Sequence, residues 1–195
     1  KWAEKAKKAV FSVVTYDTND KILNTGNGFF ISEKGVAISD YALFKNAQRA
    51  VIITSEGEKM PVKAILGAND MYDVVKFSVD ITSKKVANLT LSETPMTEGT
   101  KLWLLPYSTQ KVRSLTSGNV NSVDKISDYA YYTINLPLKE KMVSCPLMND
   151  EGLVVALAQK ASGQDTATIC YGVDARFANS QEIDRKSTRL NSSHQ

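Results

Sequence analysis

Apolar residues recur along this chain in short runs that alternate with polar positions, which is the periodicity of β-strands. Residues 10–16 are rich in β-branched and aromatic side chains and run into a cluster of turn-forming residues at 17–20. Residues 28–31 and 36–38 lie on either side of a turn at 33–35 and predict a hairpin. Further strands are predicted at residues 51–53, 62–66, 74–77, 101–105, 120–123, 129–136, 153–157 and 168–173.

The helical signal is confined to short segments. Residues 2–9 form a short lysine-rich helix candidate, residues 41–44 predict one helical turn, and residues 175–183 are expected to begin a helix. Many short strands separated by turn residues are typical of an all-β barrel or sandwich. The shift in composition at residues 89–98 predicts a link between two halves.

The composition fits a globular domain and gives no indication of a nucleic-acid or membrane partner. The 195 residues, 43% of them apolar, suffice for one larger domain or for two small barrels side by side. The formal net charge is +3, but three basic residues and one acid at 184–189 contribute +2 of it, so the rest carries only +1. No apolar run approaches transmembrane length. We therefore expect neither nucleic-acid binding nor direct insertion into a membrane.

The only histidine lies in a segment that we expect to be foreign to the protein. His194 closes residues 184–194, which read like one frame of a translated sequencing-library adapter. We therefore predict that residues 184–195 are an artefactual tail and that the intact protein continues differently after Ile183. Without this tail the chain has no imidazole at all.

The two cysteines, Cys145 and Cys170, are compatible with one disulfide in an oxidising compartment. The alternative is that both are small buried residues of a core. Two cysteines without histidine partners cannot make a structural zinc site, and we expect neither a metal nor another cofactor.

The order of several motifs is more informative than any one of them. The chain resembles trypsin-like serine proteases of the HtrA type over about residues 10–178, through the segments 12–14, 26–32, 35–39, 69–77 and 146–155. The resemblance implies an all-β fold of two packed six-stranded antiparallel barrels with short terminal helices, within a domain of residues 1–183. The first barrel would span about 10–88 and the second about 99–174. It also implies a bacterial protein that is secreted, periplasmic or part of the cell envelope.

Carried over by position, the resemblance implies a degenerate catalytic triad. Ala42 stands at the position of the base histidine, Asp73 at that of the aspartate, and Val143 at that of the nucleophilic serine. Valine has no hydroxyl to activate, and without an imidazole Asp73 has no base to orient. Lys141 replaces the glycine that helps to shape the oxyanion hole. We expect Asp73 to cap backbone groups before Val74 instead.

Two alternative nucleophiles follow the Val143 position, where the family has glycines. A one-residue slip would bring Ser144 to the nucleophile position, and Lys139 or Lys141 would then have to act as the base. Cys145 lacks a base in the same way, which favours a core or disulfide role. The trypsin-like layout places the strand after the nucleophile close to the strand near residue 168, which implies a disulfide between Cys145 and Cys170.

Three functions remain open from the sequence. The favoured one is a pseudoprotease that acts as a binding or scaffolding module for peptides, protein segments or a missing C-terminal domain of the same chain. The second is an active serine endopeptidase of the trypsin-like type. The third is a purely structural domain of a longer secreted or envelope protein. Fold resemblance alone does not choose between binding and structural roles.

Overall fold

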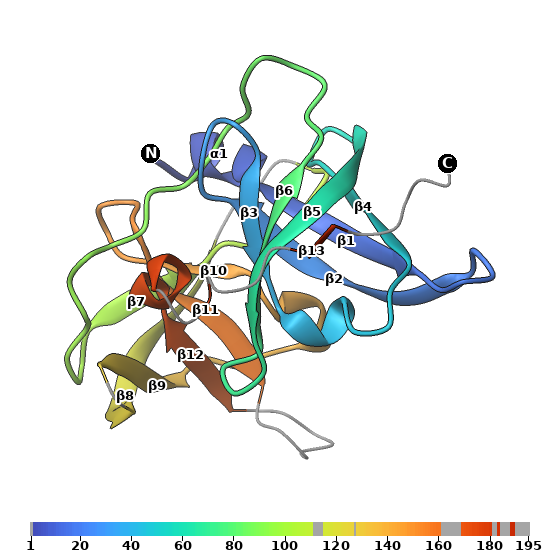
Figure 1. Cartoon of the computed structure of the whole chain (residues 1–195). Coiled ribbons are helices and arrows are strands. Elements are labelled where there is room, and N and C mark those ends of the chain that lie inside the picture. Colours follow the sequence, from blue (N-terminus) through green and yellow to red (C-terminus); the bar gives the residue numbers. More distant parts are fainter. Residues whose placement is uncertain are drawn as a thin grey trace.

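The computed structural model describes residues 2–110, 115–126, 128–160, 169–180 and 183, and the backbone of 188–189. In this part of the chain, two closed antiparallel barrels of six strands each lie side by side (Figure 1). The first barrel is drawn from blue to green and the second from yellow to orange. The predicted all-β, two-barrel fold is confirmed.

The first barrel contains strands β1 to β6 in the order β5-β4-β1-β2-β3-β6, and a pairing of β5 with β6 closes it. The hairpin predicted at residues 28–38 is confirmed, because β2 and β3 pair with Phe30 opposite Ala37. The barrel core holds an aromatic cluster in which Phe11 meets Phe30 edge-on at 4.9 Å between ring centroids. The bounds of the strands are β1 (Val10–Tyr16), β2 (Ile22–Phe30), β3 (Val36–Ser39), β4 (Arg49–Ile53), β5 (Lys59–Asn69) and β6 (Val74–Val79).

Strand β5 is longer than the prediction of residues 62–66 because it serves two neighbours. Its first residues pair with β4, and from Val62 onward it pairs with β6. Bulges between Val62 and Ala64 and between Ile65 and Gly67 bend the strand from one partner to the other. A two-residue strand, β13 (Thr188–Arg189), also pairs with β5 at Ala64 and Ile65. It lies in the segment predicted to be an artefactual tail, which stays a prediction.

The second barrel closes in the order β10-β11-β12-β9-β8-β7. Tyr132 is fully buried in its core, and its hydroxyl accepts a hydrogen bond of 2.9 Å from the backbone N–H of Met96. The chain segment between the barrels is therefore fastened to the core of the second one. The bounds of the strands are β7 (Lys101–Leu104), β8 (Thr116–Ile126), β9 (Tyr129–Asn135), β10 (Pro146–Met148), β11 (Val154–Lys160) and β12 (Cys170–Asp174).

Short helices lie where the sequence predicts them. The N-terminal segment is an α-helix, α1 (Trp2–Ala6), that continues as a 3₁₀ turn, η1 (Lys7–Ala9), and a second turn, η2 (Tyr41–Leu43), follows β3. The helix expected to begin at residue 175 is a 3₁₀ segment, η4 (Ala175–Asn179). No helix of the described chain is long and apolar enough to cross a membrane.

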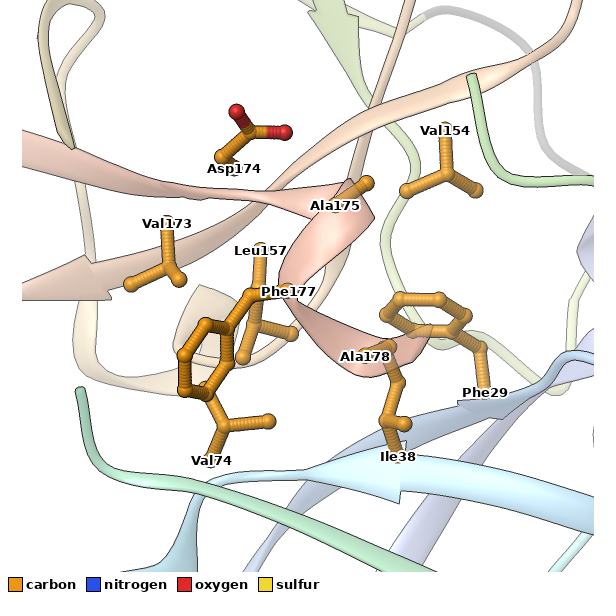
Figure 2. Close-up of a pocket in the computed structure, with 10 residues that line it drawn as sticks. All are labelled: Phe29, Ile38, Val74, Val154, Leu157, Val173, Asp174, Ala175, Phe177 and Ala178. Carbon is orange, nitrogen blue, oxygen red and sulfur yellow. The ribbon is translucent and has the colours of Figure 1, made fainter. Parts of the chain in front are cut away.

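Segment η4 fills the junction between the barrels. Figure 2 shows Phe177 and Ala178 between Ile38 and Val74 of the first barrel and Leu157 of the second. These side chains belong to one buried apolar cluster and leave a cavity of only about 10 Å³. The cavity is lined almost entirely by apolar side chains, so it offers a water molecule too few hydrogen-bond partners. The two barrels are thus joined by a dry, closely packed core.

Candidate functional site

The structure brings Ala42 and Asp73 into direct contact, as the resemblance implies. Asp73 lies in the turn between β5 and β6 with a left-handed φ of 54°. Its Oδ1 accepts a hydrogen bond of 2.7 Å from the N–H of Ala42, and its carbonyl accepts one of 3.2 Å from Tyr41. The carboxylate that would orient a base histidine in a protease therefore binds the backbone of the alanine at that position. Asp73 does act as a backbone cap, but on η2 rather than on the residues before Val74.

The second barrel supports this turn. The side-chain amide of Gln159, on β11, donates hydrogen bonds to the carbonyls of Tyr72 at 2.8 Å and Asp73 at 3.1 Å. Burial raises the pKa of the Asp73 carboxyl, an effect that the hydrogen bond from the Ala42 N–H opposes. Asp73 is thus held in place from both barrels.

Val143, at the nucleophile position, lies in a turn that starts with a 3₁₀ segment, η3 (Glu140–Met142). Asn27, on β2, donates from its side-chain amide to the carbonyl of Lys141 at 2.8 Å and to that of Val143 at 2.9 Å. The hydroxyl of Ser39 donates to the backbone carbonyl of Asn27 at 2.6 Å. One side chain of the first barrel therefore fixes the turn that would carry the nucleophile in a protease.

Two backbone N–H groups of this turn are engaged within the turn itself. The N–H of Val143 donates to the carbonyl of Glu140 at 3.3 Å, and the N–H of Met142 donates to Lys139 at 2.9 Å. Stabilising an oxyanion requires N–H groups that point at the reacting carbonyl before the reaction begins. At Val143 that donor is turned into the η3 segment.

Ser144 has the backbone conformation of a glycine. Its φ is 69°, in the left-handed region that glycine adopts readily, and its N–H donates to the carbonyl of Ala158 at 2.7 Å. This agrees with the alignment that places Val143 at the nucleophile position and Ser144 at the glycine after it.

The hydroxyl of Ser144 points into the protein rather than to its surface. The side chain is fully buried and donates a hydrogen bond of 2.5 Å to Oδ1 of Asp40, the residue between β3 and η2. Lys139 and Lys141, the lysines considered as bases, are exposed. Burial raises the pKa of Asp40 to about 6, against the lowering effect of the hydrogen bond from Ser144. This contact also links the Val143 turn to the Ala42 turn.

Cys145 and Cys170 are free, buried thiols in the structure, which does not contain the predicted disulfide. Strand β11 lies between them, because Ala158 donates to the carbonyl of Cys145 while Lys160 pairs with Cys170. Neighbouring strands lie about 4.8 Å apart, so the Cα atoms of two residues separated by two strand spacings lie farther apart than the roughly 7 Å that a disulfide allows.

The protein environment also keeps both thiols unreactive. Burial raises the pKa of Cys145 and that of Cys170 to about 12, which leaves both thiols protonated at neutral pH. A protonated thiol is a poor nucleophile, so neither cysteine has the environment of a reactive one.

Sequence reasoning missed Asp40 and Asn27. Asp40 follows directly after a buried strand, where a charged residue stands out, and Asn27 lies between two glycines in strand β2. Their partners lie more than 100 positions further along the chain. The local pattern marks both residues as unusual but does not name what they contact.

A model of the trypsin-like peptidase domain family matches residues 26–157. The match covers more than half of the chain and agrees with the two-barrel fold, so this chain belongs to the trypsin-like peptidase domain family. The same range contains Ala42, Asp73 and Val143. A search among curated proteins gives no match.

Replacing Asn27 by alanine is expected to destabilise the domain by about 2 kcal/mol, because the partly buried carbonyls of Lys141 and Val143 lose their donor. Asn88→Ala is the matched control, since its side chain only meets the carbonyl of Val86 at the surface. Urea unfolding of both variants measures the difference. Equal losses for the two would contradict the assigned role of Asn27.

Proposed function

We propose that this trypsin-like domain lacks peptidase chemistry and acts as a binding or scaffolding module of a larger secreted or cell-envelope protein. The observation that carries the proposal is the contact between Asp73 and the backbone of Ala42. In a serine protease of this fold, the carboxylate holds an imidazole that takes the proton from the nucleophile. Residues 1–193 contain no histidine that could move into this place.

Two further observations support the loss of activity. The nucleophile position is a valine, which has no hydroxyl, and its N–H is engaged within η3. A base and a nucleophile are thus both absent from the positions that the family uses, and the backbone donor at the nucleophile position is engaged. The loss of one member alone would leave residual catalysis by the others, but here the remaining aspartate has no chemistry of its own.

The binding role rests on the network that remains around these positions. Asn27 and Asp40 bond the Val143 turn across the two barrels, Ser39 supports Asn27 within the first barrel, and these bonds hold two turns beside an open hollow. A fixed hollow with polar groups at its wall is the usual form of a binding site. The HtrA-like relationship and the envelope location are part of the same proposal and rest on the sequence motifs alone.

The alternative is an active serine endopeptidase that uses Ser144. Membership of a peptidase family favours it, as does the hydrogen bond between Ser144 and the carboxylate of Asp40. Against it, the Ser144 side chain is fully buried. Activity would require the Ser144 hydroxyl to leave its buried contact with Asp40.

A fluorophosphonate probe for active serines, combined with casein cleavage, tests the proposal. We expect the purified chain to show neither labelling nor cleavage above a blank. The Ser144→Ala variant is the control, because it removes the only alternative hydroxyl in this turn while leaving the backbone in place. Labelling or cleavage that disappears in Ser144→Ala would overturn the proposal in favour of the peptidase.

A further inference from the structure

A hollow of about 390 Å³ lies between the first barrel and the η3 turn of the second. Ser12 and Thr25 contribute hydroxyl-bearing side chains to its wall, and Leu43 and Val143 contribute apolar surface. Asp40 lines the same hollow. Its size is within the range of small-ligand sites, which are mostly apolar with a few placed polar groups.

The carboxylate of Asp40 has no positively charged partner in the described part of the chain. The residue is 7% exposed, and Oδ1 accepts the hydrogen bond from Ser144. Besides Ser144, the donor that acts on this carboxylate is the backbone N–H of Asp40 itself, and no basic side chain of the described residues pairs with Asp40. A buried carboxylate normally has a cation or several donors around it.

The charges around Asp40 are also of the wrong sign to compensate it. Asp73 and Glu140 both act on it as negative neighbours. Neither basic side chain nearby pairs with Asp40: Lys160 bonds Glu140 at 2.8 Å, and Lys141 lies exposed at the edge of the hollow. The hollow therefore has one desolvated negative group that lacks a positive partner.

We propose that this hollow binds a primary ammonium group, such as the end of a lysine side chain on a bound protein segment, through Oδ2 of Asp40. The inference rests on the proposed binding role of the domain and names the ligand chemistry of the site. An ammonium carries three donors, which Asp40 and the hydroxyls of Ser12 and Thr25 can accept. A guanidinium prefers both oxygens of a carboxylate, and Oδ1 is already bonded to Ser144.

Burial of the unpaired charge supports the same ligand. The raised pKa of Asp40, about 6, means that the ionised form is costly in the folded protein. A cation placed beside Oδ2 favours the ionised form and removes much of that cost. A neutral ligand of the same shape gives no such gain.

Amide NMR of the full chain tests the proposal with n-butylammonium chloride as the probe, at pH 7.5 and constant ionic strength. We expect saturable shifts at the amides of Thr25, Asn27, Asp40 and Val143, and none from n-butanol, which is similar in shape but neutral. Asp40→Asn keeps an acceptor for Ser144 and is expected to weaken binding at least about tenfold. Glu151→Gln is the matched control, because it removes an exposed charge that does not line the hollow and is expected to change binding less than about threefold.

Two further probes distinguish a lysine side chain from a chain terminus as the source of the ammonium. N-acetyl-lysine methylamide presents a side-chain amine, whereas diglycine presents only a chain terminus, and the proposal expects binding of the first alone. Equal shifts from n-butanol, unchanged binding in Asp40→Asn, or equal affinity for n-butylguanidinium would each overturn it. The comparison of amine with alcohol needs no variant, so it decides even if Asp40→Asn does not fold. Casein cleavage is measured on the same samples, so failure of the pseudoprotease proposal is seen separately.

Discussion

Asp40→Asn is expected to stabilise the domain by about 3 kcal/mol at pH 8 and to leave its stability nearly unchanged at pH 4. The pKa of Asp40 is raised from 3.8 in the unfolded chain to about 6 in the folded protein, chiefly by burial. One pKa unit corresponds to about 1.4 kcal/mol. Well below pH 4 the carboxyl is protonated in both states and has no effect. As the pH rises through 6 the folded state must bury a charge, so the wild type loses stability.

Chemical unfolding of the wild type and the variant between pH 4 and 8 measures this effect. The asparagine is neutral throughout and still offers an oxygen to Ser144. Asp73 also has a raised pKa, but it is present in both proteins and contributes the same background. Asp70→Asn is the control, since Asp70 is exposed and pairs with Lys45 at the surface. A variant that is less stable than the wild type at pH 8 would contradict the assignment.

This cost bears on the function of the hollow. A carboxylate that weakens the fold at neutral pH has no evident structural purpose, since asparagine would satisfy Ser144 equally well. Strongly perturbed carboxylates in clefts are typical of functional sites, where binding compensates the cost. The stability experiment measures the cost of ionising the Asp40 carboxyl, and the amine titration measures its binding of a cation. Stabilisation by asparagine, together with loss of amine binding, is the combined result that we expect.

Much of the fold could be predicted because it depends on local patterns. Residues 10–16 form β1 with the predicted bounds, and residues 41–44 contain the expected turn η2. Strand ends were less predictable where pairing decides them. β8 extends over Thr116–Ile126 against a prediction of 120–123, because its partners β7 and β9 bind it along that whole length.

The candidate site was predictable only as far as the order of motifs reaches. That order placed Ala42 opposite Asp73, and the structure has them hydrogen bonded. The order of motifs did not predict contacts between the barrels, such as that of Asp40 with Ser144, because these contacts depend on how the two barrels pack. The cysteine pairing failed for the same reason: the order of strands in the second barrel puts β11 between Cys145 and Cys170.

Phe177→Ala is expected to cost about 3–5 kcal/mol, the largest loss of any single change considered for this domain. The side chain is 1% exposed at the barrel junction and packs on Tyr72 and Tyr129 with ring centroids at 4.3 and 5.3 Å (Figure 2). The cavity beside it is already small and dry, so the surrounding groups cannot fill the lost volume without moving. Urea unfolding measures the loss.

The same change is expected to reach the site, because Tyr72 precedes Asp73 and its carbonyl accepts a hydrogen bond from Gln159. Loosening Tyr72 in Phe177→Ala should therefore shift the amide resonance of Ala42, whose N–H is bonded to Asp73. Phe177→Leu is the matched control: it keeps most of the apolar volume and should cost less than about 1.5 kcal/mol while leaving Ala42 nearly unmoved. If the alanine variant lost less than about 1 kcal/mol, or if both variants moved Ala42 equally, the junction would not be what positions the two turns. In that case the hydrogen bonds of Asn27 and Ser144 would have to hold the barrels together unaided, and the loss in Asn27→Ala should then exceed that in Phe177→Ala.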